Sequence, residues 1–581
     1  MKTISFLLCS MLLTVSSQAW DPPIGIPRPA WPDLGNPIEA VAPTPPASWT
    51  ADVPGFYYVQ SGGTNANQGY PGNPRNLIPL SPAAGSVVFI NGTYSGDHRS
   101  LPITASGTST KPVWILSYNP TTPCTAIKQW TIASGSSYLI VDHVNWDWSG
   151  ASYIYSKMDI TDCNHICFRN GSTIGNGTET GTDPSPFYNI TTWGIDSSAY
   201  GKEEQIVLYN MHSTKGGNWQ YANGDPDGHG VALGTFVQDL WVVDCEFSYY
   251  SGNAIQIGAG TTGSTLDSEV SRRIYVGRCK GHHIAQAAFW SKRAEDVIFS
   301  QNTAYTMRRD TPSSSDSGGI GAQYGPRNLW IIYNTVYDCQ SGFSINSDSL
   351  GSGATSTDVY IIGNVFYNIH DLYPPTDDWR GNTYSQGGAC ISIWGGRNTY
   401  IVNNTFDDYD VGIISPGTGC SRFVDGNIFT GRSGSVSGGE LILEADPNNA
   451  NTLSYNIIEQ INGACYVQEN HGSAWQTVAA IAKGPGNSST PPTYVNKVGR
   501  NYALQAGSNG IDKFTNTAHP VYGMFNTAYA RSIAFDHSWT SDHAGVSRPQ
   551  NGSWDIGAYE FSTGTSPKLP APENPKVDFP K

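Results

Sequence analysis

A glycine-led strand motif recurs through the middle of this chain at a nearly constant spacing. Its copies begin at Gly230, Gly252, Gly319, Gly342, Gly388 and Gly412. The steps from 230 to 252, 319 to 342 and 388 to 412 are 22, 23 and 24 residues, and the step from 342 to 388 is 46, or two periods. A repeat of this length indicates a solenoid in which each unit adds one coil to a stack.

A second family of short apolar strands runs beside the first, and most of its copies end in asparagine. These asparagines are Asn210, Asn302, Asn334, Asn364, Asn404 and Asn427. Asparagine tolerates left-handed backbone and bonds to nearby backbone groups, so it suits a sharp corner. We expect the residues to form a structural ladder along the stack. Two or three strands per repeat, with no helix between them, predict an all-β parallel β-helix.

The composition agrees with this architecture and argues against nucleic acid as a binding partner. Only 14% of the 581 residues are charged, and the formal net charge is −15. Because binding to phosphates needs basic patches, an acidic chain of this kind is not expected to bind nucleic acid. No 3.6-residue periodicity is visible over a long stretch, which favours strands and tight turns over helices.

The two ends of the chain differ from its middle. Residues 1–19 read as a signal peptide, with Lys2, a short apolar run and a small-residue cleavage site that ends at Ala19. The apolar run is too short to cross a membrane, so we expect a secreted or periplasmic monomer without a transmembrane segment. A Pro-rich leader over 20–55 either packs along the solenoid or links it to something. The β-helix domain covers 56–561, and a Pro-rich tail, predicted to be disordered, covers 562–581.

Nine cysteines remain once Cys9 leaves with the signal peptide. An odd number requires at least one free thiol in an oxidising compartment. Cys245 and Cys279 occupy matching positions after their strands. They are expected to lie on neighbouring coils, either as buried apolar residues or as one disulfide.

The glycine strands also predict which side chains face the core. Residues one and three positions after the glycine are mostly apolar, as in Val231 and Leu233, and should point inward. Trp290 falls at such an inward position. Three insertions, Thr214–Asp227, Arg308–Asp316 and Asp371–Gln386, all come just before a glycine strand. Insertions on one edge of a solenoid build a binding face, so we expect a groove beside the glycine strands.

Three segments resemble secreted proteins of the pectate-lyase-like superfamily. VVFINGTYSGDH from Val87 resembles the first-coil motif of β-helix polysaccharide lyases, and NYALQAGSNGID with SWDIGAYEF resembles their closing segment. The resemblance covers about residues 57–561. It implies a single-stranded right-handed parallel β-helix (solenoid) with inserted loops along one edge, and an enzyme that degrades a polysaccharide. The motifs indicate the fold but give almost no information about the substrate.

The richest cluster of reactive residues spans four consecutive coils. The predicted catalytic residues are Asp227, His229, Lys292, Arg308 and Tyr324. The predicted substrate contacts are Trp219, His283, Arg293, Arg309, Asp316 and Gln323. If Ala287 replaces the glycine of its coil, Lys292 and Tyr324 are both five residues beyond that position. Adjacent coils are about 4.8 Å apart, so the two side chains are expected to meet the same sugar.

Two mechanisms fit these residues. A uronate lyase needs a base and a cationic group that neutralises the carboxylate, and Lys292 with Arg308 or Arg309 fits those roles. Asp225 and Asp227 are candidate ligands for a Ca²⁺ ion that would share the second task. A glycoside hydrolase needs two carboxyl groups, which Asp316 with Asp225 or Asp227 would supply. A third reading is a non-catalytic, carbohydrate-binding surface protein.

Overall fold

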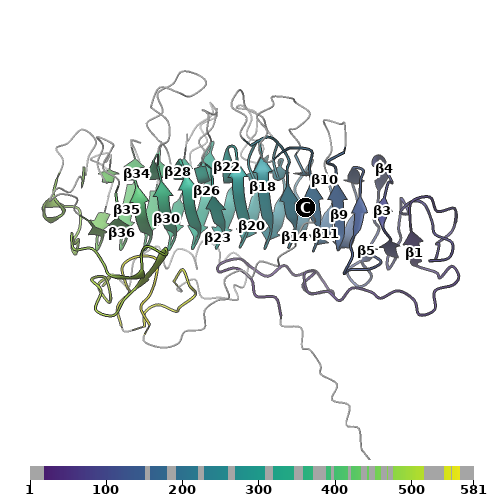
Figure 1. The fold of residues 1–581 in the computed structure, drawn as a ribbon, viewed down its shortest axis with the longest axis horizontal. Helices are drawn as coiled ribbons and strands as arrows, with labels where there is room; N and C mark the ends of the chain where they lie inside the picture. Colours follow the sequence, from purple (N-terminus) through teal and green to yellow (C-terminus); the bar gives the residue numbers. More distant parts are fainter. Residues whose placement is uncertain are drawn as a thin grey trace, which may run out of the picture.

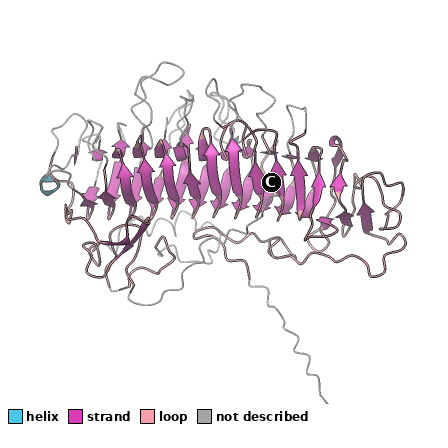
Figure 2. Ribbon diagram, in the orientation of Figure 1, coloured by secondary structure: helices cyan, strands magenta, loops and turns pink. Residues whose placement is uncertain are grey.

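The chain folds into one long stack of coils built from three parallel sheets (Figure 1, Figure 2). The computed structural model describes residues 19–150, 158–178, 191–219, 228–258, 269–307, 318–345, 358–370, 388–393, 398–415, 421–432, 441–443, 452–459, 467–468, 476–515, 542–550 and 552–562. Each coil places one strand in each sheet, and every strand pairs in parallel with its counterparts on the neighbouring coils. The predicted parallel β-helix is confirmed.

We name the three sheets by what covers or marks them. The leader sheet comprises β1 (Phe56–Val59), β2 (Val87–Ile90), β5 (Val113–Ser117), β8 (Ser137–Asp142), β11 (Asn164–Arg169), β14 (Glu204–Tyr209), β17 (Gln238–Val243), β20 (Arg272–Gly277), β23 (Glu295–Ser300), β26 (Arg327–Ile332), β29 (Val359–Ile362), β32 (Asn398–Val402), β35 (Ser421–Asp425) and β38 (Thr452–Ser454).

The chain passes next to the tyrosine sheet. It comprises β3 (Thr93–Tyr94), β6 (Cys124–Ala126), β9 (Val144–Asp147), β12 (Ser172–Ile174), β15 (His212–Thr214), β18 (Glu246–Tyr250), β21 (Lys280–Ile284), β24 (Thr303–Tyr305), β27 (Thr335–Cys339), β30 (Val365–Ile369), β33 (Thr405–Tyr409), β36 (Ile428–Thr430) and β39 (Ile457–Ile458).

The glycine sheet completes each coil. It comprises β4 (His98–Ile103), β7 (Trp130–Ile132), β10 (Met158–Thr161), β13 (Trp193–Asp196), β16 (Val231–Leu233), β19 (Ile255–Ile257), β22 (Ala287–Lys292), β25 (Gly318–Gln323), β28 (Ser341–Ile345), β31 (Ala389–Ile393), β34 (Val411–Ser415), β37 (Leu441–Leu443) and β40 (Val467–Gln468). Beyond the stack, the short helix η3 (Val478–Ala480) precedes an antiparallel pair, β41 (Tyr494–Asn496) and β42 (Asn501–Leu504).

The core lies inside the three sheets, and alternation along each strand fills it. Val231 pairs with Ile255, Ile255 with Phe289 and so on along the stack, and these side chains are fully buried. Leu233 and its counterparts form a second buried row. The predicted inward positions of the glycine strands are therefore confirmed.

The register of the glycine motif is partly different from the prediction. The strand pairing aligns Gly230, Ala254, Ala288, Gly319, Gly342, Cys390 and Gly412 in one column. Gly252 and Gly388 begin two residues earlier, and Ala288, rather than Ala287, holds the glycine position. Small residues are required because the next coil passes close by. A Cβ on Gly342 would lie 2.3 Å from the carbonyl oxygen of Cys390.

The three predicted insertions enter at one corner, as expected from the sequence. They fall between β15 and β16, between β24 and β25, and between β30 and β31, which is the turn from the tyrosine sheet to the glycine sheet. The long connection 175–192, between β12 and β13, enters at the same corner, whereas 258–271 and 346–358 follow the glycine strands β19 and β28. Most residues of these six connections lie outside the described part of the chain.

An asparagine ladder runs through the corner between the leader and tyrosine sheets. In an unbroken series, Nδ2 of one asparagine donates to Oδ1 of the next. The members are Asn302, Asn334, Asn364, Asn404, Asn427, Asn456 and Asn487. Each Oδ1 also accepts the backbone N–H of the preceding ladder asparagine, at 2.8 to 3.0 Å. The predicted ladder is confirmed for five of its six members and extends two coils further.

The left-handed backbone at this corner belongs to the residue before the ladder. Tyr333 and Asn403 have φ values of 58° and 54°, and the ladder asparagines that follow them do not have positive φ. Asn210 (φ 49°) is in this left-handed column, where it bonds to Asn170 at 2.9 Å. Its assignment to the ladder was wrong. A ladder asparagine satisfies buried backbone groups, while the corner is turned by its neighbour.

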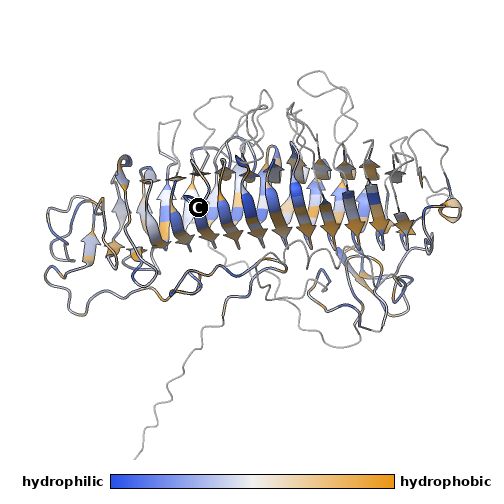
Figure 3. Ribbon diagram, turned by 180° about the vertical axis from the view of Figure 1, so that it is seen from behind, coloured by the Kyte–Doolittle hydropathy of each residue, from blue (hydrophilic) through white to orange (hydrophobic). Residues whose placement is uncertain are grey.

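The N-terminal leader packs lengthwise along the outer face of the leader sheet (Figure 1, Figure 3). Trp31 and Trp49 join the outward side chains of this sheet in a second apolar cluster. Arg169 donates to the carbonyl oxygens of Pro37, Ile38 and Ala40, each at 2.8 Å. Of the two alternatives for the leader, packing along the solenoid is confirmed.

The closing motif SWDIGAYEF, near the C-terminus, lies beside the C-terminal coils of the stack (Figure 1). It contacts the corner between the leader sheet and the tyrosine sheet. Its backbone bonds directly to the coils: Gly557 N–H donates to the Gly426 carbonyl at 2.8 Å, and Ala558 N–H donates to Thr405 Oγ1 at 3.0 Å. Asn403 Nδ2 donates to the Asp555 carbonyl at 2.9 Å. The motif typical of such proteins is therefore a docking segment.

The described cysteines are buried free thiols, and Cys245 and Cys279 form no disulfide. Both occupy the column that the asparagine ladder continues, because Cys279 N–H donates to Asn302 Oδ1 at 2.9 Å. The buried apolar reading of this pair is confirmed. In the described part of the chain, no helix is long and apolar enough to cross a membrane.

Glu203 is a fully buried carboxyl group at the turn from the glycine sheet to the leader sheet. Its Oε2 accepts the backbone N–H of Cys163 at 2.6 Å, and its Oε1 has no hydrogen-bond partner among the described residues. Burial raises the pKa of Glu203 to about 9. The folded protein therefore holds this side chain in its neutral form at pH 7.

We predict that Asn364→Ala lowers the free energy of unfolding by about 3 kcal/mol, because it leaves the Asn334 N–H and the Ile331 carbonyl buried without partners. Denaturant titration measures the loss. Asn487→Ala, at the half-buried end of the ladder, is the matched control and should cost clearly less. Equal losses would contradict a cooperative ladder.

We predict that Glu203→Gln stabilises the protein at neutral and alkaline pH. A carboxyl group whose pKa rises from 4.5 to about 9 on folding gives its full stability only below about pH 4.5, and that stability is lost as the pH rises toward 9. The loss amounts to about 3 kcal/mol by pH 7. Melting temperatures from pH 4 to 9 should fall less steeply for the variant, and parallel curves would refute the assignment.

Candidate active site on the tyrosine sheet

The predicted groove beside the glycine strands is not where the open strand face lies. From β22 to β31 the outward residues in the middle of the glycine strands are covered: Trp290 is 6% exposed, and Ser344 and Ser392 are fully buried. Trp290 alternates with the inward residues Phe289 and Ser291 and packs over Gly321, so its predicted inward position was wrong, although the side chain is buried. The outward row of the tyrosine sheet, by contrast, is half-buried over many coils.

A carboxylate and two histidines form a connected chain on this open face. Glu246 of β18 and His282 of β21 lie on adjacent coils, and Glu246 Oε1 is 3.1 Å from His282 Nε2. His282 Nδ1 is in turn 2.9 Å from Nδ1 of His283. His282 is 12% exposed and Glu246 32% exposed, so solvent and ligands reach the group. We call Glu246, His282 and His283, with Tyr249 and Trp219 beside them, the histidine cluster.

A local irregularity of the strand brings the two histidines together. In a regular strand, consecutive side chains point to opposite faces, so neighbours in sequence do not touch. His283 has a φ of 54°, and Tyr249, its counterpart on β18, has a φ of 59°. This left-handed residue breaks the alternation, and both rings of the histidine pair then lie on the outer side. Backbone strain of this kind costs about 1 to 3 kcal/mol and is common at functional sites.

For a neutral His282, the two contacts imply the tautomers of both rings. The pKa of Glu246 is held below its usual range by the hydrogen bond from His282, so the carboxylate is charged and accepts. Neutral His282 then carries its proton on Nε2 and accepts on Nδ1. His283 must donate from Nδ1, which leaves its own lone pair on Nε2. The chain is therefore arranged as a relay that supports proton uptake at His283 Nε2.

Aromatic rings enclose the relay. The Tyr249 ring lies 4.8 Å from the His283 ring, and the Trp219 ring meets His283 edge-on at 5.0 Å. On the far side, Tyr305 stacks on His282 at 4.7 Å and begins a row that continues through Tyr337 and Tyr367. Since the faces of these tyrosines are occupied by one another, the row offers ring edges and hydroxyl groups to a ligand.

The structure separates several residues that the sequence analysis grouped. Lys292 ends β22 and pairs with Gln323, so the prediction that it shares a register with Tyr324 was wrong by one residue. His283 comes before β22 and Lys292 at its end, so a six-residue strand of about 17 Å lies between them. Lys292, Arg293, Gln323 and Tyr324 therefore belong to the opposite edge of the glycine sheet from the histidine cluster.

His229 lies at the correct corner but is deeply placed. It is 3% exposed, and its Nδ1 accepts the backbone N–H of Asn253 at 2.8 Å. A Cβ on Gly252 would lie 2.5 Å from that nitrogen, so the ring is packed tightly against the next coil. This environment favours a structural role. Its catalytic role stays a prediction, as do the roles of the other predicted residues.

The remaining predicted residues are outside the described part of the chain. They are Asp225, Asp227, Arg308, Arg309 and Asp316. The calcium prediction rests on two of them and is therefore untested. Within the described residues, no group of three or more histidine, cysteine or acidic side chains is arranged to hold a metal ion.

Sequence reasoning named Trp219 and His283, but it did not name Glu246 or the relay that runs through His282. A usable signal was present, because Cys245 and Cys279 were already aligned on adjacent coils. That alignment sets Glu246 beside Lys280 and Ser248 beside His282, as the strand pairing shows. The contact between His282 and His283 could not be foreseen, because it depends on the positive φ.

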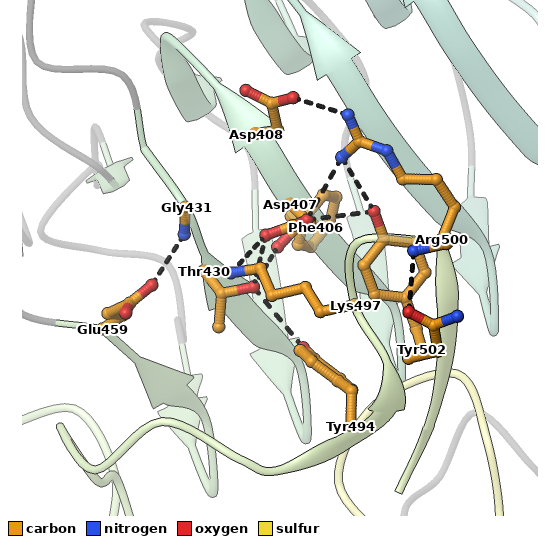
Figure 4. A network of polar contacts seen from close by, with 12 residues as sticks. Phe406, Asp407, Asp408, Thr430, Gly431, Glu459, Tyr494, Lys497, Arg500 and Tyr502 are labelled. Atoms are coloured by element: carbon orange, nitrogen blue, oxygen red, sulfur yellow. Dashed lines mark hydrogen bonds and ion pairs between the residues drawn. The ribbon is translucent and has the colours of Figure 1, made fainter.

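A second polar network lies further along the same sheet (Figure 4). Asp407 is 1% exposed and accepts bonds from Thr430 Oγ1 at 2.8 Å and Tyr502 Oη at 3.0 Å, and it pairs with Lys497 Nζ at 2.8 Å. Arg500 pairs with Asp408 at 2.9 Å and lies over the Tyr367 ring. This network holds the segment of β41 and β42 on the stack, so we interpret it as a clamp.

No protein-family model matches the sequence, and no curated protein matches it. Solved structures with a similar fold include a GH136 lacto-N-biosidase from Eubacterium ramulus, with 12% identity, TM-score 0.36, and coverage of 75% of this chain and 68% of that one. A mannuronic acid specific polysaccharide family 6 lyase from human gut microbiota has 12% identity, TM-score 0.38, and coverage of 72% and 89%.

A rhamnogalacturonan lyase has 13% identity and a TM-score of 0.35, with coverage of 62% of this chain and 82% of that one. Identities and TM-scores this low do not transfer an activity from one protein to another. The function has to be derived from this protein's own residues.

We predict that Asp407→Asn loosens the clamp and lowers the free energy of unfolding by about 2 kcal/mol, because charge-assisted bonds to a buried carboxylate are lost. Limited proteolysis should then cut within 494–504 faster than in the parent protein. Asp408→Asn, at a position with 36% exposure, is the control and should cost less than about 1 kcal/mol. Cleavage at the parent rate in Asp407→Asn would show that the clamp does not hold this segment.

Proposed function

We propose that the protein is a polysaccharide-degrading enzyme that cleaves a uronate-containing chain by β-elimination at the histidine cluster. The supporting observation is the relay from Glu246 through His282 to His283 on the open face of the tyrosine sheet. A relay of this kind is what a general base needs, because the charge gained on the base is balanced by the carboxylate at the other end of the chain.

The elimination begins with removal of the proton next to the uronate carboxyl group. His283 Nε2 accepts this proton, and the resulting imidazolium is stabilised through His282 by the Glu246 carboxylate. The electron pair of the broken C–H bond forms the new C=C bond as the glycosidic C–O bond breaks, and the leaving oxygen takes a proton from water. A cation must balance the charge that develops on the substrate carboxylate. Lys280 of β21 is one candidate, and Arg308, which directly follows Met307 in sequence, is another.

The number of carboxylates in the cluster favours elimination over hydrolysis. A glycoside hydrolase of the usual kind requires two carboxyl groups on either side of the scissile bond. Among the described residues of the histidine cluster, Glu246 is the single carboxylate, and its Oε1 is engaged by His282. A base supported by one carboxylate matches a lyase.

The open face also suits an extended substrate. Outward positions repeat on every coil about 4.8 Å apart, so a polymer lying along the stack meets similar groups at regular intervals. Beyond the relay, the row from Tyr305 to Tyr367 offers hydroxyl groups. Hydroxyl groups bind neutral and acidic sugars alike, so the row does not by itself select the polymer.

We predict that the protein releases unsaturated products, detected by ultraviolet absorbance, from at least one polymer in a panel of uronate polysaccharides. His283→Ala should lower kcat/KM by about 10²-fold or more because the base is lost. Glu246→Gln should lower kcat by about tenfold with a smaller change in KM, because the relay loses its charge. His165→Ala, which removes a histidine beside the leader, is the control and should leave activity unchanged.

Three outcomes would overturn the proposal. Loss of activity in Lys292→Ala together with full activity in His283→Ala would place the base on the glycine sheet, as the sequence analysis predicted. Release of new reducing ends without the unsaturated product would show a hydrolase. Binding of the polymer with no cleavage at all would instead favour the non-catalytic reading.

A further inference from the structure

The chain changes from exposed to buried across a single peptide bond at its described N-terminal end. Ala19 is exposed, whereas Trp20 is 8% exposed. The Trp20 indole donates from Nε1 to Asp244 Oδ2 at 2.9 Å, and its ring meets Tyr209 edge-on. Trp20 is therefore the first residue of the leader that is seated on the solenoid.

The backbone nitrogen of Trp20 has an acidic partner. It donates to Glu39 Oε1 at 2.5 Å, although a peptide N–H carries no charge. Arg28 shares the same carboxylate oxygen at 3.2 Å. Glu39 therefore contacts both Trp20 and Arg28 of the leader. The Trp20 nitrogen that faces its carboxylate is the atom that becomes a free amine if the chain is cut before Trp20.

We propose that hydrolysis of the Ala19–Trp20 peptide bond is the maturation step of this protein, and that the new α-ammonium group of Trp20 pins the leader through Glu39. A peptidase of the export machinery would break the C–N bond with one water molecule. The hydroxyl group goes to the Ala19 carbonyl carbon and a proton to the Trp20 nitrogen. The amine takes a second proton from solvent at neutral pH, because α-amino groups have a pKa near 8.

Two independent features of the chain support the position of the cut. The residues before it, Ser17-Gln18-Ala19, have the small-residue pattern that export peptidases recognise. The residue after it has a carboxylate already in place for a charged nitrogen. A peptide N–H gives this carboxylate one neutral donor, whereas an ammonium group gives a full charge, and charge-assisted bonds are about twice as strong.

The consequence concerns the docking of the leader. Arg278 pairs with Asp244 at 2.6 Å and donates to the Asp21 carbonyl at 2.6 Å, and Ile24 N–H donates to Gln301 Oε1 at 2.9 Å. A tighter first residue therefore holds a segment that spans several coils of the leader sheet. Cleavage strengthens this docking by one charged contact and adds no new surface.

The first test is the N-terminus of the protein exported by cells that make the full chain. Intact mass and N-terminal sequencing should give a chain that starts at Trp20. A different first residue would overturn the cleavage site, whatever the enzyme activity. Because neither readout involves a substrate, failure here is distinct from failure of the proposed lyase function.

The second test separates the ammonium contact from the seating of the indole ring. Chains starting at Trp20 and at Ala19 both keep the indole, but only the first places its ammonium group at Glu39. Hydrogen exchange over residues 20–28 should show about fivefold more frequent opening in the chain that starts at Ala19. Glu39→Gln should abolish this difference between the two chains. Equal exchange in the two parent chains would refute the pin.

Discussion

The stack depends on the hydrogen bonds that join each coil to the next at a fixed spacing. Parallel pairing provides hydrogen-bond partners for the backbone groups of the strands. The backbone groups at the corners need other partners. The asparagine ladder from Asn302 to Asn487 supplies those partners, because each side chain accepts from one coil and donates to another. Since a ladder asparagine without its neighbour leaves buried groups unpaired, the register of every later coil follows from the one before it.

The three sheets share this framework and differ in what covers them. The leader seals the outer face of the leader sheet with tryptophan side chains and carbonyl groups that bond to Arg169 and Trp241. The closing motif and the clamp seal the far end of the stack. The glycine sheet is closed over Trp290 and Ser392. The central coils of the tyrosine sheet stay accessible, and this is where reactive side chains are connected to one another.

The sequence predicted the fold well because the fold is periodic. Glycine and asparagine recur at corresponding positions of successive coils, so both patterns are visible without a structure. The exact register of the glycine strands was harder to predict. Gly252 and Gly388 look like their neighbours, yet the pairing sets Ala254 and Cys390 in the glycine column. A two-residue slip preserves the alternation of inward and outward side chains, so hydrophobic pattern alone does not detect it.

The site was harder still to predict because it depends on a departure from regular strand geometry. Predicting Lys292 as the base followed from a regular strand, in which consecutive residues face opposite ways. The histidine pair exists because His283 adopts a φ of 54°. That feature recurs on many coils, as in Lys215, Thr306 and Asp338, so the left-handed column belongs to the fold.

At each position of this column, the fold points the side chain outward, next to the outward side chain of the preceding residue in the sequence. Thr306 and Asp338 use the arrangement to hydrogen-bond to each other. At 282 and 283 the sequence sets two histidines in succession, with a glutamate one coil away, and the same geometry connects these three titratable groups. The backbone therefore determines where a relay can form, and the side chains at 246, 282 and 283 determine that one does.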